Sequence, residues 1–357
     1  MPEKAQKNKE SNARKKKVTM KDIAEQLGLS INAVSLALND RPGVGDATRK
    51  LVLDTAEQMG YLDQSSKYIQ TYSNKNICVL LKHRFFRDFR FYGRILLGIE
   101  EEAKKSGYDV IINSYEEDEI PACVEGHKVS GIIVVGKIND SFLIRLREYG
   151  IPIVLADHVS GKIDMDCVLS DNKRGAYKMA MYLLEQGFTK IGYVGDLEYT
   201  PSTRERFIGL QEAVRQFFSK SMDESIDYLK RFSALNFHEE FVINREADKV
   251  YEAFQEIEEK PEVLFCSNDE LAVFLMKTLQ NNGYSVPADI AITGFDDIEL
   301  CKMITPTLTT VHVQKKMMGI KAMQILLRRI TKPREDAEQL VLNVEIIKRD
   351  SARKEEV

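Results

Sequence analysis

Polar side chains that could bind a small polar molecule follow several apolar runs of the sequence. Asp157 closes the run IPIVLAD, Asn268 follows VLFCS, and Asp296 follows AITGF. Arg206 falls in the amphipathic pattern that begins after Pro201. An arginine offers a fixed fork of donors, an asparagine offers both a donor and an acceptor, and a carboxylate accepts from two hydroxyls. This set therefore suits the adjacent hydroxyl groups of a neutral polyol.

A second candidate segment is KHRFFRDFRFYGRILLGIE, residues 82–100, in which aromatic and arginine side chains alternate. Ligand pockets are lined mainly by apolar and aromatic side chains, so the segment predicts one pocket wall, with Phe86 and Phe89 as the contacts. Its arginines would also suit an acidic or phosphorylated sugar. Aromatic and arginine residues in alternation equally fit an anion or nucleic-acid surface, and the sequence leaves that alternative open.

The motifs of the common enzyme families are missing from the sequence. The five histidines form no HExxH or other metal-ligand spacing, and there is no GxSxG, no Walker phosphate loop and no GxGxxG after the first apolar run. We therefore predict no catalytic residue, no metal and no cofactor, and expect the chain not to be an enzyme.

The elements that must position these residues follow from the rhythm of the sequence after Asn76. Helical patterns, the first expected near residues 92–106, alternate with short apolar runs: ICVLL, YDVIIN, GIIVVG, IPIVLAD, IGYVGD, VLFCSND, DIAITGFDD and TLTTVHV. Strands alternating with helices indicate βαβ units with parallel sheets. The rhythm occurs in two series, which predicts two similar lobes over residues 77–350. Ligands of such sheets bind beyond the carboxyl ends of the strands, here in the cleft between the lobes.

Residues 20–40, MKDIAEQLGLSINAVSLALND, contain two short helical patterns around Gly28. Helices shorter than about 12 residues are marginal in water, so these two must pack on each other. Thr19 and Ser30 are placed to cap them, and a third helix is expected over about residues 47–59. A short helix, a tight turn and a second short helix predict a helix-turn-helix, whose second helix enters a duplex groove.

The charge of the chain is distributed unevenly. Residues 1–70 carry 12 Lys and Arg against 9 Asp and Glu, whereas residues 71–357 carry 39 against 46. A basic head on an acidic body predicts that only the head approaches a polyanion. Residues 1–17 are expected to be a basic disordered arm that adds non-specific phosphate attraction.

Composition also indicates a cellular compartment. The chain has no run of about 18 apolar residues, and no apolar core follows the basic start, so we expect neither a transmembrane segment nor a secretory signal. The five cysteines are scattered and include no CxxC pair, which favours free, mostly buried thiols. A cytoplasmic protein is expected.

The segment VTMKDIAEQLGLSINAVSLALNDRPGVGDATRKLVLDTAEQMGYL resembles the DNA-binding head of the lactose-repressor family of bacterial transcription regulators. The resemblance covers residues 18–61 and implies that residues 31–36 enter the major groove. The DNA-contacting residues it implies are Thr19, Ser30, Ile31, Asn32, Ala33, Ser35, Leu36, Asn39 and Tyr61.

Two positions depart from the usual pattern of that family. Leu36 stands where the family usually has an arginine suited to guanine, and it offers only apolar contact, for instance with a thymine methyl. The apolar Ile31 opens the recognition helix beside Asn32, which is suited to adenine. We therefore expect an operator sequence that differs from the one usual in the family.

Residues 62–76, LDQSSKYIQTYSNKN, correspond to the hinge of the same family. In that family an apolar side chain is wedged into the minor groove, and such wedges kink the duplex. Ile69 is the nearest candidate for this role. A plain polar linker that orders only on DNA is an equal alternative.

The body is similar to the effector domain of the same repressors, which is related to periplasmic sugar-binding proteins. The matching segments are Asp171-Asn172, Arg206-Phe207-Ile208-Gly209, Ser267-Asn268-Asp269, Gly294-Phe295-Asp296-Asp297 and Thr305-Pro306-Thr307-Leu308-Thr309-Thr310. By this resemblance Arg206, Asn268 and Asp296 contact a sugar.

The resemblance implies a homodimeric repressor of carbohydrate-utilisation genes. Paired heads would read a near-palindromic operator, because two-fold symmetry in the protein requires it in the DNA. A small sugar-like effector between the lobes would control DNA binding. Two alternatives remain: a catabolite-control regulator whose co-repressor is a phosphorylated carrier protein, and a sugar-binding protein with a vestigial head.

Overall fold

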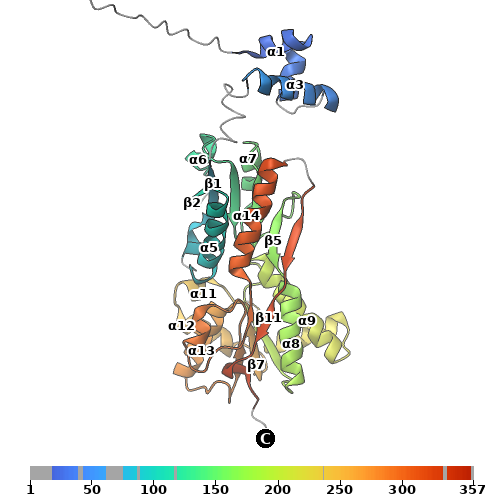
Figure 1. Cartoon of the computed structure of the whole chain (residues 1–357). Helices are drawn as coiled ribbons and strands as arrows, with labels where there is room; N and C mark the ends of the chain where they lie inside the picture. The colour runs from blue at the N-terminus through green and yellow to red at the C-terminus, as the bar shows by residue number, and fades with distance from the viewer. Residues whose placement is uncertain are drawn as a thin grey trace, which may run out of the picture. The chain divides into compact units, whose positions relative to one another are not determined.

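The computed structural model describes residues 18–38, 43–61, 75–86, 89–115, 119–235, 237–332 and 336–354. The chain divides into two compact units, Met1–Asn74 and Lys75–Val357, and each is described by itself (Figure 1). The expectations for the arm over residues 1–17, for Asn39 and for the hinge with Ile69 fall outside the described residues.

Unit 1 is a bundle of three short helices around one small core. The helices are α1 (Met20–Leu27), α2 (Ile31–Leu38) and α3 (Asp46–Gln58). The buried side chains from all three helices are Ile23, Ala24, Val34, Ala37, Leu38, Val52 and Ala56. The predicted helix-turn-helix is therefore confirmed, and each helix is held by the other two.

Side chains cap the first two helices as the sequence predicts. The Thr19 hydroxyl accepts a hydrogen bond from the Asp22 amide at 3.3 Å, while the Asp22 carboxylate accepts one from the Thr19 amide at 2.6 Å. The Ser30 hydroxyl accepts from the Ala33 amide at 3.1 Å. Both caps satisfy amides that would otherwise lack a partner at a helix start.

Gly28 ends α1 in the left-handed region, with φ of 65°, and Gly28→Val should destabilise unit 1 by about 1–2 kcal/mol. A Cβ at this position would meet no atom within 4 Å, so the cost comes from backbone strain alone. Thermal unfolding followed by circular dichroism, with operator affinity in parallel, measures the effect. Gly28→Asn is the matched control, because asparagine tolerates this region, and equal losses in both variants would contradict the prediction.

The first lobe of unit 2 is built on a six-stranded sheet with the order β10-β5-β4-β3-β1-β2, in which every neighbouring pair is parallel. The strands are β1 (Asn76–Lys82), β2 (Asp109–Tyr115), β3 (Gly131–Val135), β4 (Ile153–Ala156), β5 (Cys167–Ser170) and β10 (Gln339–Leu342). Its helices are η1 (His83–Phe86), α5 (Phe89–Lys105), α6 (Ala122–Glu125), α7 (Asp140–Arg147) and α14 (Lys315–Thr331).

The second lobe contains a three-stranded parallel sheet with the order β6-β7-β8. Its strands are β6 (Ile191–Val194), β7 (Val263–Cys266) and β8 (Ala291–Thr293). Its helices are α8 (Asn172–Glu185), α9 (Pro201–Phe217), α10 (Met222–Phe232), α11 (Glu240–Ile243), α12 (Ala247–Gln255), α13 (Asp269–Asn281), η2 (Glu299–Lys302) and η3 (Asp350–Ala352). A separate antiparallel pair joins β9 (Thr310–His312) to β11 (Glu345–Ile347).

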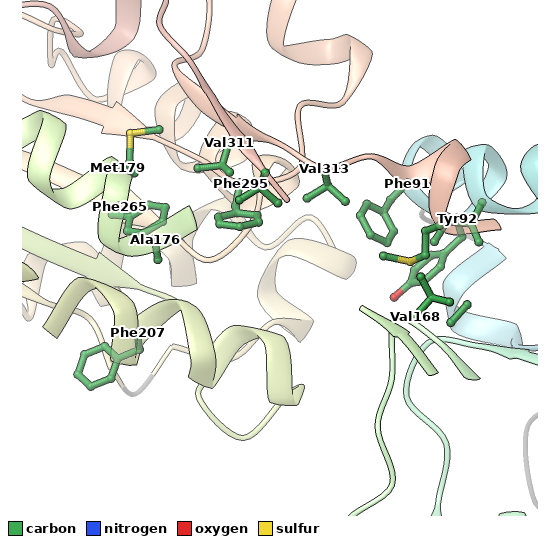
Figure 2. Packing of buried hydrophobic residues seen from close by; sticks show 14 of the residues in the cluster. Phe91, Tyr92, Val168, Ala176, Met179, Phe207, Phe265, Phe295, Val311 and Val313 are labelled. Atoms are coloured by element: carbon green, nitrogen blue, oxygen red, sulfur yellow. The ribbon is translucent and has the colours of Figure 1, made fainter. Parts of the chain in front are cut away.

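The chain passes between the lobes after β5, after β9 and after β10, as Figure 1 shows. One apolar cluster continues through these crossings, because it includes Val168 of the first sheet and Phe265 of the second. In Figure 2, Val313 lies between Phe295 of the second lobe and Phe91 of the first. The prediction of two parallel-sheet lobes joined by several crossings is confirmed, and the shared core makes unit 2 one body.

The two long helices of the first lobe touch through glycines. A Cβ on Gly98 of α5 would lie 2.1 Å from the Lys316 carbonyl oxygen, and one on Gly319 of α14 would lie 2.0 Å from the Ile95 carbonyl oxygen. Neither position therefore accepts a side chain without separating the helices.

In the described part of the chain, no helix is both long enough and apolar enough to span a bilayer.

Candidate functional site

A cavity of about 130 Å³ lies between the two lobes of unit 2. Its lining includes Asp157, which follows β4 in the first lobe, together with Arg206, Asn268 and Asp296 from the second. These four residues are far apart in the sequence, and the parallel strands bring them together because their carboxyl ends face the same cleft. The structure thus gathers four of the six predicted ligand-site residues.

Arg206 of α9 is the centre of the polar lining and is only 6% exposed. Its Nε donates to Asn172 Oδ1 at 3.1 Å, its Nη1 to the Ser267 carbonyl oxygen at 2.5 Å, and its Nη2 to Asp296 Oδ1 at 3.0 Å. The guanidinium also lies 3.9 Å from the ring centroid of Phe295. The buried arginine is thereby both neutralised and held in one orientation.

Asp296 sits on a turn with φ of 118°, just beyond β8. Burial raises the pKa of its carboxyl, while the charges of Arg206 and Lys315 act in the opposite direction. The Lys315 ammonium donates to the backbone carbonyl of Asp296. Burial lowers the pKa of Lys315. The carboxyl group is therefore buried, is paired directly with Arg206, and has the charge of Lys315 nearby.

Asn268 caps the start of α13 and links it to a buried acid. Its Oδ1 accepts from the Leu271 amide at 2.8 Å, and its Nδ2 donates to Glu239 Oε1 at 2.8 Å. The second oxygen of Glu239 is buried and has no hydrogen-bond partner in the described part of the chain. Burial raises the pKa of Glu239 to about 7, against the hydrogen bond from Asn268.

Glu239 lines the cavity, although sequence reasoning did not identify it. It stands in the run HEEF just before the four-residue helix α11 rather than after a strand. The rule that locates Asp157, Asn268 and Asp296, polar side chains at strand ends, therefore does not locate Glu239. The local sequence offers no other signal.

Asp157 adopts φ of 59° directly after β4 and is half-buried in the lining. Burial raises the pKa of its carboxyl to about 7, and the nearby charge of Arg206 lowers it only in part. The neighbouring His158 is buried outside the lining, and burial lowers its pKa. Two carboxyl groups with pKa near neutrality, Asp157 and Glu239, thus face one cavity.

The prediction for Phe89 is wrong about its position. Its side chain is 62% exposed and lies over Gly93, where an added Cβ would meet the ring at 2.8 Å. The reason is that α5 begins at Phe89, three residues before the expected start, which turns this first-turn side chain outward. Phe85, Phe91 and Tyr92 line the cavity instead.

These aromatic residues form a compact wall in the first lobe. The ring centroids of Phe85 and Tyr92 are 4.7 Å apart, and those of Phe91 and Tyr92 are 4.9 Å apart. The predicted aromatic wall is therefore present, built from neighbours of the residues expected. The backbone of Phe86 belongs to η1, but its side chain lies outside the described part of the chain.

Two arginines of the same segment join the lobes. Arg90 pairs with Glu270 of the second lobe at 2.9 Å, and Arg94 pairs with Glu299. Arg84 does line the cavity, with its guanidinium 5.0 Å from the ring centroid of Tyr199.

The charges of the lining do not favour an acidic ligand. Four carboxyl residues, Asp157, Glu239, Glu270 and Asp296, stand against three arginines, Arg84, Arg206 and Arg245. Arg206 is already engaged with Asp296, and Glu239 has one buried carboxyl oxygen without a hydrogen-bond partner in the described part of the chain. The lining therefore favours a ligand that donates hydrogen bonds.

In unit 1 the second helix leaves one side open. Ile31 is 52% exposed and Asn32 is exposed, whereas Val34 and Leu38 are buried in the three-helix core. Ala33, Ser35 and Leu36 are half-buried. An exposed isoleucine at the start of a helix is thus not part of the core.

Two further residues expected at the DNA have structural contacts. The Tyr61 side chain packs against the unit 1 core, and its amide donates to the Ala56 carbonyl at 2.9 Å. Thr19 is engaged in the cap of α1.

The fold and the cavity define a class of protein: a helix-turn-helix head joined to a two-lobed ligand-binding body. The family comparison gives the particular family. The model of "Bacterial regulatory proteins, lacI family" matches residues 19–64, and that of "Periplasmic binding protein-like domain" matches residues 180–352. The chain belongs to the lacI family of transcriptional regulators. It is a DNA-binding transcriptional regulator with a periplasmic-binding-protein-like effector domain, and not an enzyme.

Curated relatives match over nearly the whole chain. The HTH-type transcriptional repressor PurR of Aliivibrio salmonicida is 27% identical over 344 residues, covering 94% of this chain and 99% of the relative. The probable HTH-type transcriptional repressor ExuR of Bacillus subtilis is 27% identical over 352 residues, with the same coverage.

Solved structures share the fold. The complex of the transcriptional regulator CelR with cellobiose has a TM-score of 0.67 at 21% identity, over 94% of this chain and 99% of that one. A LacI family regulator of Enterococcus faecium with bound ribose has a TM-score of 0.65 at 26% identity, over 78% and 98%.

Proposed function

We propose that this protein represses carbohydrate-utilisation genes in the cytoplasm and responds to a neutral sugar or sugar derivative bound between the lobes of unit 2. The observation that carries the proposal is the Arg206–Asp296 pair beside Asn268, opposite an aromatic wall in the same cavity. The ribose bound by the Enterococcus faecium regulator supports the same ligand class.

The cavity suits the two kinds of surface that a sugar presents. The hydroxyl groups of a sugar require hydrogen-bond acceptors as well as donors, and the carboxyl groups of Asp157, Glu239 and Asp296 supply acceptors. The apolar face of a sugar ring packs against flat aromatic groups, which Phe91 and Tyr92 supply. Phe86 stays a proposed contact.

Binding would control DNA affinity through the arrangement of the lobes. The lining comes from both lobes, so a ligand that contacts both favours one arrangement over another. It shifts DNA affinity only by its difference in affinity for the two arrangements. Two chains in a homodimer would place paired heads on a near-palindromic operator.

Titration calorimetry tests the effector assignment on the full chain. We expect one neutral mono- or disaccharide from a panel that includes ribose and cellobiose to bind once per chain and to change operator affinity. If no sugar binds and a phosphorylated carrier protein raises operator affinity instead, the carrier-controlled alternative replaces this proposal.

The proposed DNA contacts lie on the exposed side of α2 and on both sides of that helix in the sequence. Before α2 they are Thr19 and Ser30, and after it they are Asn39, Tyr61 and the hinge residue Ile69. Asn32→Ala should weaken binding to the selected operator by about 1–3 kcal/mol and relax the preference at one base pair. In vitro selection of bound duplexes before and after the change measures both effects.

A matched control is Lys104→Ala, which removes an exposed charge from α5 in unit 2. It should leave the selected sequence unchanged. If Asn32→Ala weakens binding to every duplex equally, Asn32 contacts the backbone and not a base edge.

A further inference from the structure

Two cysteines that are 45 positions apart in the sequence meet inside the first lobe. Cys78 belongs to β1 and Cys123 to α6, and their sulfur atoms lie 3.7 Å apart. Asn113 of β2 faces both, with its Nδ2 3.5 Å from the Cys123 sulfur and 3.8 Å from the Cys78 sulfur. The sulfurs are in contact but unbonded, since a disulfide has a length of about 2.05 Å.

The two thiols of this pair differ in access and in acidity. Cys78 is fully buried, whereas Cys123 is only half-buried. The hydrogen bond between the two thiols lowers the pKa of Cys123 to about 7, with burial acting against it. The same contact, together with burial, raises the pKa of Cys78. Cys123 is therefore a partly exposed thiol that ionises near neutrality, which is the combination that makes a cysteine reactive.

The other three cysteines provide a contrast within the same chain. Cys167, Cys266 and Cys301 are buried, and burial raises the pKa of each thiol. Thiols of that kind are inert toward oxidants. Reactivity should thus be confined to the pair.

We propose that Cys78 and Cys123 form a reversible thiol–disulfide site that reacts with hydrogen peroxide. The Cys123 thiolate attacks one peroxide oxygen, the O–O bond breaks, and Cys123 becomes a sulfenic acid while the other oxygen leaves and is protonated to water. The Cys78 sulfur then attacks the Cys123 sulfur, the S–O bond breaks, and a second water forms with the Cys78 proton. Two thiols lose two electrons in total, and hydrogen peroxide gains them.

The site lies where the chain enters unit 2. Cys78 is near the start of β1, and the preceding Asn76 already bonds to the segment that follows α6, through its Nδ2 to Lys128 O at 3.1 Å and its carbonyl from the Ser130 amide at 2.8 Å. Figure 1 places α6 beside β1 at the end of the first lobe farthest from the second. A disulfide would therefore bond the entry strand to α6, away from the ligand cavity.

The test uses the full reduced chain and hydrogen peroxide. We expect the loss of two of the five thiols, a mass lower by two hydrogens, and a non-reduced peptide joining residues 78 and 123. A dithiol reductant should restore all five. Because these readouts need no variant, they stand even if a cysteine substitution prevents folding.

Variants then assign the order of the steps. Cys123→Ser should lose no thiol, whereas Cys78→Ala should stop at a sulfenic acid on Cys123 that dimedone labels. Cys167→Ser, a change at a buried thiol outside the pair, should still lose two thiols. Links between chains, links through any other cysteine, or unchanged thiol loss in Cys123→Ser would each overturn the proposal.

Discussion

Replacing Arg206 with methionine should lower the free energy of unfolding of unit 2 by about 3–5 kcal/mol. The guanidinium is buried and bonds Asp296 at 3.0 Å and the Ser267 carbonyl at 2.5 Å. Methionine fills much of the same space but leaves the Asp296 carboxylate buried beside one cation fewer. Breaking one side of a buried ion pair costs more than the pair contributes, because the remaining charge is uncompensated.

Urea unfolding of the full chain at neutral pH measures this loss. The double variant Arg206→Met with Asp296→Leu should regain most of it, since no lone charge remains. The matched control is Arg204→Met on the same helix α9. Arg204 pairs with Glu198 at 2.6 Å, but their side chains are 53% and 83% exposed, so the loss should stay below about 1 kcal/mol.

This expectation changes how Arg206 can be used as a probe. If Arg206 only contacted the ligand, losing it would remove the ligand response and spare operator binding. The structure shows that the residue also holds Asn172, Ser267 and Asp296 in place. A lost ligand response in an Arg206 variant would therefore not distinguish a lost ligand contact from misfolding. If the free energy of unfolding falls by less than about 1 kcal/mol, the Arg206–Asp296 pair does not stabilise unit 2 as described here.

The fold and half of the site are accessible from the sequence for one physical reason. Buried strands of a parallel sheet are continuous apolar runs, so their ends, and the polar residues that follow, can be located by eye. That rule locates Asp157, Asn268 and Asp296, and the sheets bring them to one cavity. An equally local rule locates the capping residues Thr19 and Ser30.

What the sequence does not reveal depends on helix phase and on contacts distant along the chain. Helix α5 begins three residues earlier than expected, so Phe89 is exposed and Phe91 is buried. In a run of aromatic residues, no apolar pattern shows which ring will face inward. Glu239 precedes a helix too short to give a periodic signal. Cys78 and Cys123 meet only because α6 packs beside β1.

Ligand affinity should rise with pH between about 6 and 8, by up to about tenfold per pH unit for each coupled carboxyl. Burial raises the pKa of both Asp157 and Glu239 to about 7 in the empty cavity. Hydroxyl donors from a sugar favour the ionised carboxylates, so binding releases protons. Below pH 7 the ligand must displace those protons, and above pH 8 they are already gone, so the affinity levels off.

Calorimetry in buffers of different ionisation enthalpy counts the released protons, with ribose, cellobiose or another neutral sugar found to bind. Asp157→Asn should reduce the pH dependence to that of Glu239 alone while keeping the fold, because asparagine tolerates the left-handed φ of 59° at this position. Glu198→Gln removes a carboxylate that is 83% exposed and should leave the curve unchanged. If the ligand affinity of the native chain does not change from pH 6 to 8, the hydroxyl donors of the ligand reach neither Asp157 nor Glu239. The ligand would then contact Arg84, Asn268 and the aromatic wall instead.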